Sequence, residues 1–345
     1  MKSFASDNNS GVHPDVLAAL AASNDGHAVG YGDDPWTASA NARFDDLFGR
    51  EVDVLFVWNG TGANVVGLGS ILRPFEAVIC TANAHIHVDE TGAPEGIIGV
   101  KLIDLPTPDG KLRPADIEAQ VHAIGVPHHS QPKVVSITQS TEVGTLYTPD
   151  EVRAIADTAH AHGLYLHMDG ARIANATAAL DCDVADITCD AGVDVMSFGG
   201  TKNGMMYGEA VVYFDRSFAA TGQFFRKHAT QLPSKCRFVS AQFGALLSDD
   251  LWLRNARHSN AMAKLLAARV RDIPGVRLTR EPEVNSVFAV LERRHIEALM
   301  ARHFFYIWDE HTNEVRWMTS FDTTEADIDA FATSIAEVTA SDQNG

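Results

Sequence analysis

The chain has 345 residues, of which 46% are hydrophobic, and a formal net charge of −18. This length is sufficient for one large hydrophobic core and a second, smaller unit. The acidic balance argues against nucleic acid or an anionic membrane as the main partner, but it leaves room for a small anionic ligand in a local basic pocket.

Cysteine usage and hydropathy suggest the compartment. Four cysteines are scattered without the spacing of a metal site, so we interpret them as small buried residues in a reducing environment. The first residues form no apolar signal region, and no run approaches the roughly 18 apolar residues of a membrane-spanning helix. The sequence therefore predicts a soluble cytoplasmic protein without a membrane partner.

The N-terminal region contains a polar segment followed by two helices. Residues Phe4–Val12 (FASDNNSGV) are rich in turn-forming and capping residues, which is typical of a frayed terminus. Proline in the first turn predicts a helix at Pro14–Ala22. The turn signal Tyr31–Pro35 then precedes a second helix, Thr37–Phe48.

A strand, a glycine turn and a helix come next. The buried strand Val52–Trp58 leads into Asn59–Asn64 (NGTGAN), and an apolar helix follows at Val65–Leu72. This arrangement presents backbone N–H groups to an anion, and the hydroxyl of Thr61 adds a further donor. The segment matches neither the GxGxxG nor the Walker pattern, which weakens a nucleotide interpretation. A simple turn and a phosphate site both stay open.

The chain then alternates between strands and helices. Strands are predicted at Ala77–Cys80, Val100–Ile103, Val134–Thr138, Leu164–Met168, Val193–Met196 and Ala210–Phe214, and helices at Pro114–Ala123 and Pro149–His162. This alternation predicts an α/β fold with a mostly parallel central sheet and helices on both faces.

Chemically distinctive residues follow the predicted strands. They are Gly60 and Thr61, His85, Glu142, Asp169 and Lys202. Ligands of open α/β sheets bind at the carboxyl ends of the strands, so this common placement predicts one shared site.

Lys202 lies among glycines in SFGGTKNG, directly after an apolar strand. Ammonium groups avoid such positions unless they are paired or used chemically, and partial burial favours the nucleophilic amine. The segment therefore indicates either a Schiff-base lysine for pyridoxal phosphate (PLP) or an ordinary lysine in a surface loop.

Asp169 and two histidines add to this picture. A buried carboxylate such as Asp169, after the apolar segment LYLHM, would keep the ring nitrogen of PLP protonated, although an aspartate there can also cap a helix. His85 and His87 have a spacing of two, which would place them on one face of a strand. A metal pair, structural histidines and a ring stacked on a flat cofactor are the alternatives, and no third metal ligand has suitable spacing.

The pattern changes after about residue 231. A long helix is predicted over Phe238–Arg271, with a break near Asp249 and Asp250. Strands at Val276–Leu278, Val287–Leu291 and Val315–Met318, and helices at Arg294–Arg302 and Thr324–Val338, complete a smaller α+β unit. We therefore predict a large PLP-binding domain over residues 14–245 and a small domain formed by residues 1–13 and 246–345, with the N-terminal segment contributing to the active site.

Several segments together resemble one enzyme family. FASDN, YGDD, NGTGAN, NAHIHVDETGAP, HMDGAR and FGGTKNG resemble the low-specificity L-threonine aldolases, which belong to the β-eliminating lyase group of fold-type I PLP-dependent enzymes; the resemblance extends from about Phe4 to Asp327. It implies cleavage of L-threonine, L-allo-threonine and related β-hydroxy-α-amino acids to glycine and an aldehyde. It also implies a homotetramer, built as a dimer of dimers with shared active sites.

The resemblance also implies roles for individual residues. Lys202 would carry PLP, Asp169 would pair with the ring nitrogen, and His85 would stack on the ring. The remaining cofactor contacts would come from Gly60, Thr61, Arg172 and Arg237. The amino-acid substrate would be held by Ser6, Tyr31, Arg172 and Arg316, with Tyr31 in a position to reach a neighbouring subunit.

Two questions stay open at this point. Many family members have a histidine where this chain has Glu142, so His85, Glu90, Glu142 and a water molecule are all candidates for the general base. Arg316 is either a substrate clamp or a solvent-facing partner of Glu314.

Other functions are also compatible with the sequence. They are a phenylserine-selective aldolase, another β-eliminating PLP lyase, a non-catalytic PLP-binding protein and a nucleotide-binding α/β protein.

Overall fold

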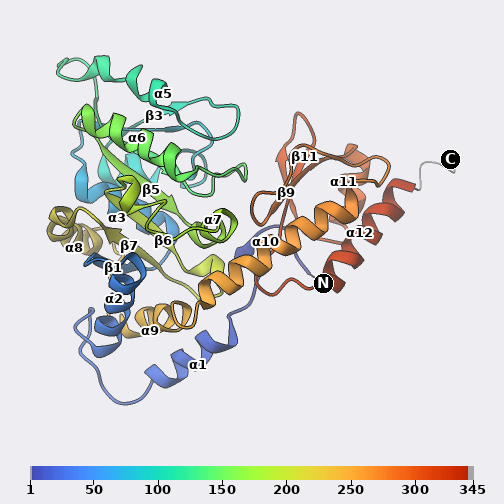
Figure 1. Cartoon of the computed structure of the whole chain (residues 1–345), viewed down its shortest axis with the longest axis horizontal. Coiled ribbons are helices and arrows are strands. Elements are labelled where there is room, and N and C mark those ends of the chain that lie inside the picture. The colour runs from blue at the N-terminus through green and yellow to red at the C-terminus, as the bar shows by residue number, and fades with distance from the viewer. Residues whose placement is uncertain (1, 341–345) are drawn as a thin grey trace.

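Two β-sheets organise the chain (Figure 1). The computed structural model describes residues 2–340, within which there are a seven-stranded sheet and a four-stranded sheet. The larger sheet consists of β1 (Asp53–Val57), β2 (Glu76–Thr81), β3 (Lys101–Leu105), β4 (Gln131–Thr138), β5 (Tyr165–Gly170), β6 (Val195–Gly199) and β7 (Glu209–Tyr213). All seven were predicted from the sequence.

The strand directions of the larger sheet determine where the carboxyl ends of its strands lie, and we call this end of the sheet its functional edge. The strands lie in the order β1-β7-β6-β5-β4-β2-β3, and β7 runs antiparallel to both of its neighbours while the other pairs are parallel. As a result β1, β2, β3, β4, β5 and β6 all have their carboxyl ends at the same edge of the sheet. The predicted α/β fold with a mostly parallel sheet is confirmed.

Helices cover both faces of this sheet. On one face lie α3 (Gly60–Ile71) and α8 (Ala219–His228); on the other lie α2 (Pro35–Phe48), α5 (Pro114–Glu118), α6 (Pro149–Ala161), α7 (Ile173–Leu180) and α9 (Arg237–Leu246). On the second face the fully buried Phe44 of α2 contacts Phe198 of β6 edge-to-face. Within residues 2–340, no helix is long and apolar enough to cross a membrane.

The four-stranded sheet lies beyond the helix α10 (Leu251–Val270), which runs from the larger sheet to the smaller one (Figure 1). It consists of β8 (Arg277–Leu278), β9 (Ser286–Val290), β10 (Tyr306–Asp309) and β11 (Glu314–Met318), with α11 (Arg293–Met300) and α12 (Glu325–Ala340) as its helices. The predicted break before α10 is confirmed, because Asp249 and Asp250 adopt the left-handed conformation with φ of 49° and 54°.

Within residues 2–340, three α-helices and one strand were not predicted from the sequence. They are α4 (His85–Val88), α7, α8 and β10. Short helices and an edge strand carry weak periodic signals, so packing against the neighbouring sheet decides their conformation.

The alternative of a frayed terminus for residues Phe4–Val12 was wrong. Phe4 is fully buried and stacks on Phe331 of α12, with ring centroids 4.2 Å apart. Its N–H donates to the carbonyl of Phe304, and its carbonyl accepts from the N–H of Met318. The N-terminal segment is therefore anchored to the smaller unit before the chain continues into α1 (Pro14–Ser23), which packs on α9.

We predict that the substitution Phe4→Ala lowers the free energy of unfolding by about 3–5 kcal/mol, because it leaves a cavity against Phe331. Urea-induced unfolding measures this change. Phe224→Ala is the matched control, since that ring is 73% exposed and its loss should change stability by less than about 0.5 kcal/mol. Equal effects of the two substitutions would show that the N-terminal segment is not anchored.

Candidate active site

The functional edge of the larger sheet opens into a cavity of about 730 Å³. Its walls come from the N-terminal segment, from the loops that follow β2, β4, β5 and β6, and from β10 and β11 of the smaller sheet. Six of the residues singled out in the sequence line it together: Ser6, His85, Glu142, Arg172, Lys202 and Arg316.

Lys202 lies in a short loop directly after β6. The N–H of Gly200, two residues before Lys202, donates a hydrogen bond of 2.5 Å to the buried carboxylate of Glu209 on β7. This bond anchors the loop to the sheet. Burial and the nearby charge of Arg172 lower the pKa of Lys202. The amine is therefore placed at the cavity in an environment that favours its nucleophilic form.

Asp169 is the penultimate residue of β5 and is only 4% exposed. Its Oδ1 atom accepts from the N–H of Ala171 at 2.9 Å, and its Oδ2 atom accepts from Nδ2 of Asn64 at 2.9 Å. Burial alone would raise the pKa of Asp169, but the charge of His85 and these hydrogen bonds lower it. The carboxylate is therefore kept ionised and oriented by the protein.

His85 begins the helix α4 instead of lying on a strand. Its Nδ1 atom is 2.8 Å from Oε1 of Glu90, and its backbone N–H donates to Oε1 of Glu142 at 2.8 Å. The hydrogen bond to Glu90 raises the pKa of His85. His87 lies elsewhere, 3.7 Å from Asp104, because residues two apart on a helix do not share a face. The idea of a histidine pair on one strand face was therefore wrong.

Arg172 is held by a partner that the sequence did not suggest. Asp7 accepts from Nε and from one terminal nitrogen of Arg172, at 2.7 and 2.9 Å, and also from Nδ2 of Asn285 at 3.1 Å. Burial would raise the pKa of Asp7, but the charge and hydrogen bonds of Arg172 lower it to about 2. This contact fixes the guanidinium at the cavity wall beside Ser6.

Arg316 reaches the same cavity from the smaller sheet. Its guanidinium lies over the ring of Trp308, 4.7 Å from the centroid, and among the described residues its buried Nε atom has no hydrogen-bond partner. Burial and the charge of Arg172 lower the pKa of Arg316 to about 10. Glu314 pairs instead with Arg280 at 3.4 Å, so the alternative of a surface ion pair between Arg316 and Glu314 was wrong.

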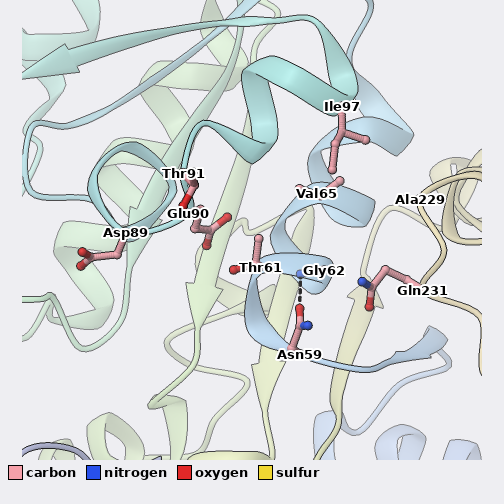
Figure 2. Close-up of a pocket in the computed structure, with 10 residues that line it drawn as sticks. All are labelled: Asn59, Thr61, Gly62, Val65, Asp89, Glu90, Thr91, Ile97, Ala229 and Gln231. Carbon is pink, nitrogen blue, oxygen red and sulfur yellow. Dashed lines mark hydrogen bonds between the residues drawn. The ribbon is translucent and has the colours of Figure 1, made fainter.

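A second cavity, of about 350 Å³, lies at the start of α3 (Figure 2). The N–H of Gly62 donates to Oδ1 of Asn59 at 2.7 Å, which caps the helix. Figure 2 shows Asp89 and Glu90 on one side of this cavity and Gln231 on the other. A Cβ atom at Gly62 would lie 2.2 Å from the carboxamide of Gln231, so a larger residue at this position would require that side chain to move.

Gly60 and Thr61 form the first turn of α3, where helix N–H groups and the helix dipole favour an anion. Space beside Gly60 is open, since a Cβ atom built there would have no neighbour within 4 Å. Asp89 lines both this cavity and the larger one, so the two adjoin.

The structure places Tyr31 and Arg237 apart from these cavities. Arg237 lines a third cavity, of about 300 Å³, and donates to the backbone carbonyls of Asp25 and Gly26. Tyr31 is more than half exposed, and its N–H donates to the carbonyl of Ser234 in the same region. Within one chain these two residues do not meet Lys202, and their predicted roles stay predictions.

The chain is similar to one protein family and to several known proteins. The family model described as "Beta-eliminating lyase" matches residues 3–294. A low specificity L-threonine aldolase of Pseudomonas aeruginosa is 47% identical over 93% of each chain, and one of a second Pseudomonas strain is 45% identical over 97% of each chain. The solved structure of a threonine aldolase of Leishmania major covers 99% of this chain and 100% of its own, with a TM-score of 0.92 and 36% identity.

The buried Glu209 generates a prediction about pH. Burial raises its pKa from 4.5 to about 7, although the hydrogen bond from Gly200 acts in the opposite direction. Because the folded chain holds this proton more tightly than the unfolded chain, its contribution to stability is greatest below pH 4.5 and is lost as the pH rises to about 7.

We therefore expect the wild-type protein to lose about 2–3 kcal/mol of stability relative to Glu209→Gln between pH 5 and pH 8. Urea-induced unfolding of the cofactor-free proteins at several pH values measures the difference. Glu118→Gln, at an exposed position, is the control and should give a curve parallel to that of the wild type. Parallel curves for Glu209→Gln as well would contradict the raised pKa.

Proposed function

The chain belongs to the low specificity L-threonine aldolase family within the β-eliminating lyases, and we propose that it cleaves L-threonine, L-allo-threonine and related β-hydroxy-α-amino acids to glycine and an aldehyde. The observation that carries this proposal is the meeting of Lys202, Asp169 and two arginines at one edge of the sheet. A nucleophilic amine, a buried carboxylate and a carboxylate clamp are the groups that this reaction requires.

The donor set fits pyridoxal phosphate as the cofactor. When bound, PLP supplies an electron sink for negative charge at the Cα atom of an amino acid. The amine of Lys202 would hold the aldehyde carbon of PLP, and the first turn of α3 at Gly60 and Thr61 would bind its phosphate. The Asp169 carboxylate would keep a proton on the ring nitrogen, and His85 would lie against the ring.

The substrate would be held by its carboxylate. Arg316 presents a buried Nε atom that has no partner among the described residues, and this donor suits a carboxylate oxygen. Arg172 is already oriented by Asp7, which leaves its second terminal nitrogen available for the substrate beside Ser6. Arg172, which follows β5, and Arg316, on β11, would together set the angle of the scissile Cα–Cβ bond.

A protein group or a water molecule must accept the proton of the β-hydroxyl group. His85 and Glu142 line the cavity with Lys202, and Glu90 lines the adjoining one. Burial and the charge of Asp169 raise the pKa of Glu142, which favours proton uptake by this carboxylate. The histidine that many family members have at this position is thus replaced by another group that is able to accept a proton.

Assembly and location follow from the family resemblance. We infer a homotetramer with shared active sites in the cytoplasm. The exposed side chain of Tyr31, together with Arg237 on the same surface, supports a contact with a second copy of the chain. Light scattering of the purified protein tests the oligomeric state.

The activity test is incubation of the purified protein with PLP and each substrate, with glycine and aldehyde measured separately. The panel contains L-threonine, L-allo-threonine and L-phenylserine, together with L-serine derivatives that report β-elimination. Release of equal amounts of glycine and acetaldehyde from the threonines supports the proposal. Pyruvate or ammonia as the product would instead support a β-eliminating lyase.

We predict that Lys202 is the residue that carries the cofactor. Borohydride treatment of the PLP-loaded protein followed by peptide mapping should place the pyridoxyl group on Lys202, because its amine is partly desolvated at the cavity. Lys202→Ala should lose this label and at least about 10³-fold of the activity, on the scale of removing a covalent catalytic group. A label on Lys101 or Lys227 would refute the assignment.

A further prediction concerns the substrate clamp. Arg316→Ala should weaken the binding of glycine and threonine by about 2–5 kcal/mol, the cost of removing one partner of a desolvated ion pair. Arg316→Lys should restore only part of this loss, because lysine lacks the guanidinium fork. Glycine titrations followed by the visible absorption of the PLP-loaded protein measure the effect.

Arg280 provides the control for this experiment. It is also an arginine of the smaller unit stacked on an aromatic ring, 4.5 Å from the centroid of Phe288, but it does not line the cavity. Arg280→Ala should leave glycine binding unchanged. Unchanged glycine affinity in Arg316→Ala would remove Arg316 from the substrate site.

A further inference from the structure

Asn64 lies in the second turn of α3 and is 1% exposed. Its side chain makes three hydrogen bonds, to Asp169, Glu90 and Ser197, so it lies directly behind the groups assigned to the cofactor. We propose that Asn64 is a positioning residue whose amide holds Asp169 and the Glu90–His85 pair in a fixed mutual arrangement. The inference rests on the proposed function and extends it to a residue outside the cavity.

The orientation of the Asn64 amide is determined by its surroundings. The hydroxyl of Ser197 donates to Oδ1 of Asn64 at 2.8 Å, and this oxygen accepts but cannot donate. Both hydrogens of Nδ2 are then directed to carboxylates, with Glu90 Oε1 at 2.8 Å and Asp169 Oδ2 at 2.9 Å. A rotated amide would place its oxygen against two carboxylates, which is unfavourable.

A buried histidine next to Ser197 is compatible with this direction of donation. His167, on β5, is 3.4 Å from Oγ of Ser197 through Nε2 and 2.9 Å from Oγ of Ser136 through Nδ1. Burial lowers the pKa of His167 to about 4, so the ring is neutral and carries one N–H group. With that N–H on Nε2, the ring donates to Ser197, which in turn donates to Asn64.

The pairing of β5 and β6 positions this chain of hydrogen bonds. Ser197 on β6 is the direct neighbour of Asp169 on β5 in the parallel register, and His167 neighbours Val195 in the same pair of strands. Residues two apart on a strand share a face, so His167 and Asp169 both face α3. Ser197 and Asp169, which both bond to Asn64, are thus held in position by the backbone pairing of β5 and β6.

The amide controls two functional groups at once. With Ala171 and Asn64 as donors, each oxygen of Asp169 accepts a hydrogen bond, which fixes the plane of the carboxylate. Glu90 shares its Oε1 atom between Asn64 and Nδ1 of His85, so the amide also fixes the carboxylate that orients the imidazole. Loss of the amide would leave two buried carboxylates close together with fewer donors, and both groups would be free to turn.

The primary test is Asn64→Leu, which keeps a side chain of similar size but removes the donors. We expect the dissociation constant of PLP to rise by about 10- to 100-fold, and kcat for threonine to fall by a similar factor while KM changes by less than about threefold. The visible absorption maximum of the PLP-loaded variant should also shift, because that band reports the surroundings of the ring. These readouts separate positioning from a purely structural role.

Ser197→Ala is the second, milder variant and serves if Asn64→Leu does not fold. It removes the hydroxyl that orients the amide and should shift PLP affinity and kcat in the same direction by a smaller factor. Ser197→Thr retains a hydroxyl and should restore values near those of the wild type.

Asn175→Leu is the matched control. Asn175 is also a buried asparagine, bonded to Ser259 and Asn260 where α7 meets α10, and it touches none of the groups in this network. It should lower thermal stability without changing PLP affinity, absorption or kcat.

The proposal is overturned if Asn64→Leu and Ser197→Ala lose only thermal stability, as Asn175→Leu does, while PLP affinity, kcat and absorption stay within about twofold of the wild type. PLP affinity and absorption do not depend on turnover. An inactive wild-type protein would therefore count against the proposed function, and these two readouts would still decide the role of Asn64.

Discussion

Burial of charged groups at one edge of the larger sheet is the constraint on which the site depends. Asp7, Asp169 and Glu209 are each less than 10% exposed, where a carboxylate without partners is strongly disfavoured. A guanidinium stabilises the charge of Asp7, and an amide and a backbone N–H stabilise that of Asp169, whereas burial raises the pKa of Glu209 to about 7 although this group accepts from the N–H of Gly200. The contacts that keep these charges buried are also the contacts that orient the reactive groups.

The N-terminal segment joins the two sheets around this edge. Phe4 is buried against the helices and strands of the smaller unit, and three residues later Asp7 contacts both Arg172 and Asn285. Arg172 follows a strand of the larger sheet, whereas Asn285 precedes a strand of the smaller one. A segment that looks like a polar terminus therefore completes the cavity wall and links Arg172 to the smaller unit.

The sequence was most informative where chemistry and strand pattern coincide. Lys202, Asp169 and His85 could be assigned to one site because each follows an apolar strand, and parallel strands end at the same edge. Asp7 and Asn64 gave no such signal. Asp7 lies in a segment without periodicity, and Asn64 lies in a helix whose side chains are nearly all buried, so its partners could not be deduced from spacing.

The sequence alone therefore determined the class of fold, the seven strands of the larger sheet and the chemical identity of the central groups, because these depend on local periodicity and on residue types that have few other uses. The tertiary structure decided which buried groups are partners. It separated Arg316 from Glu314, brought Asp7 to Arg172 and placed Asn64 between two carboxylates. Such pairings join residues as far as 278 positions apart, as Asp7 and Asn285 show. They arise from strand register and from the packing of helices on the sheet, which no local pattern encodes.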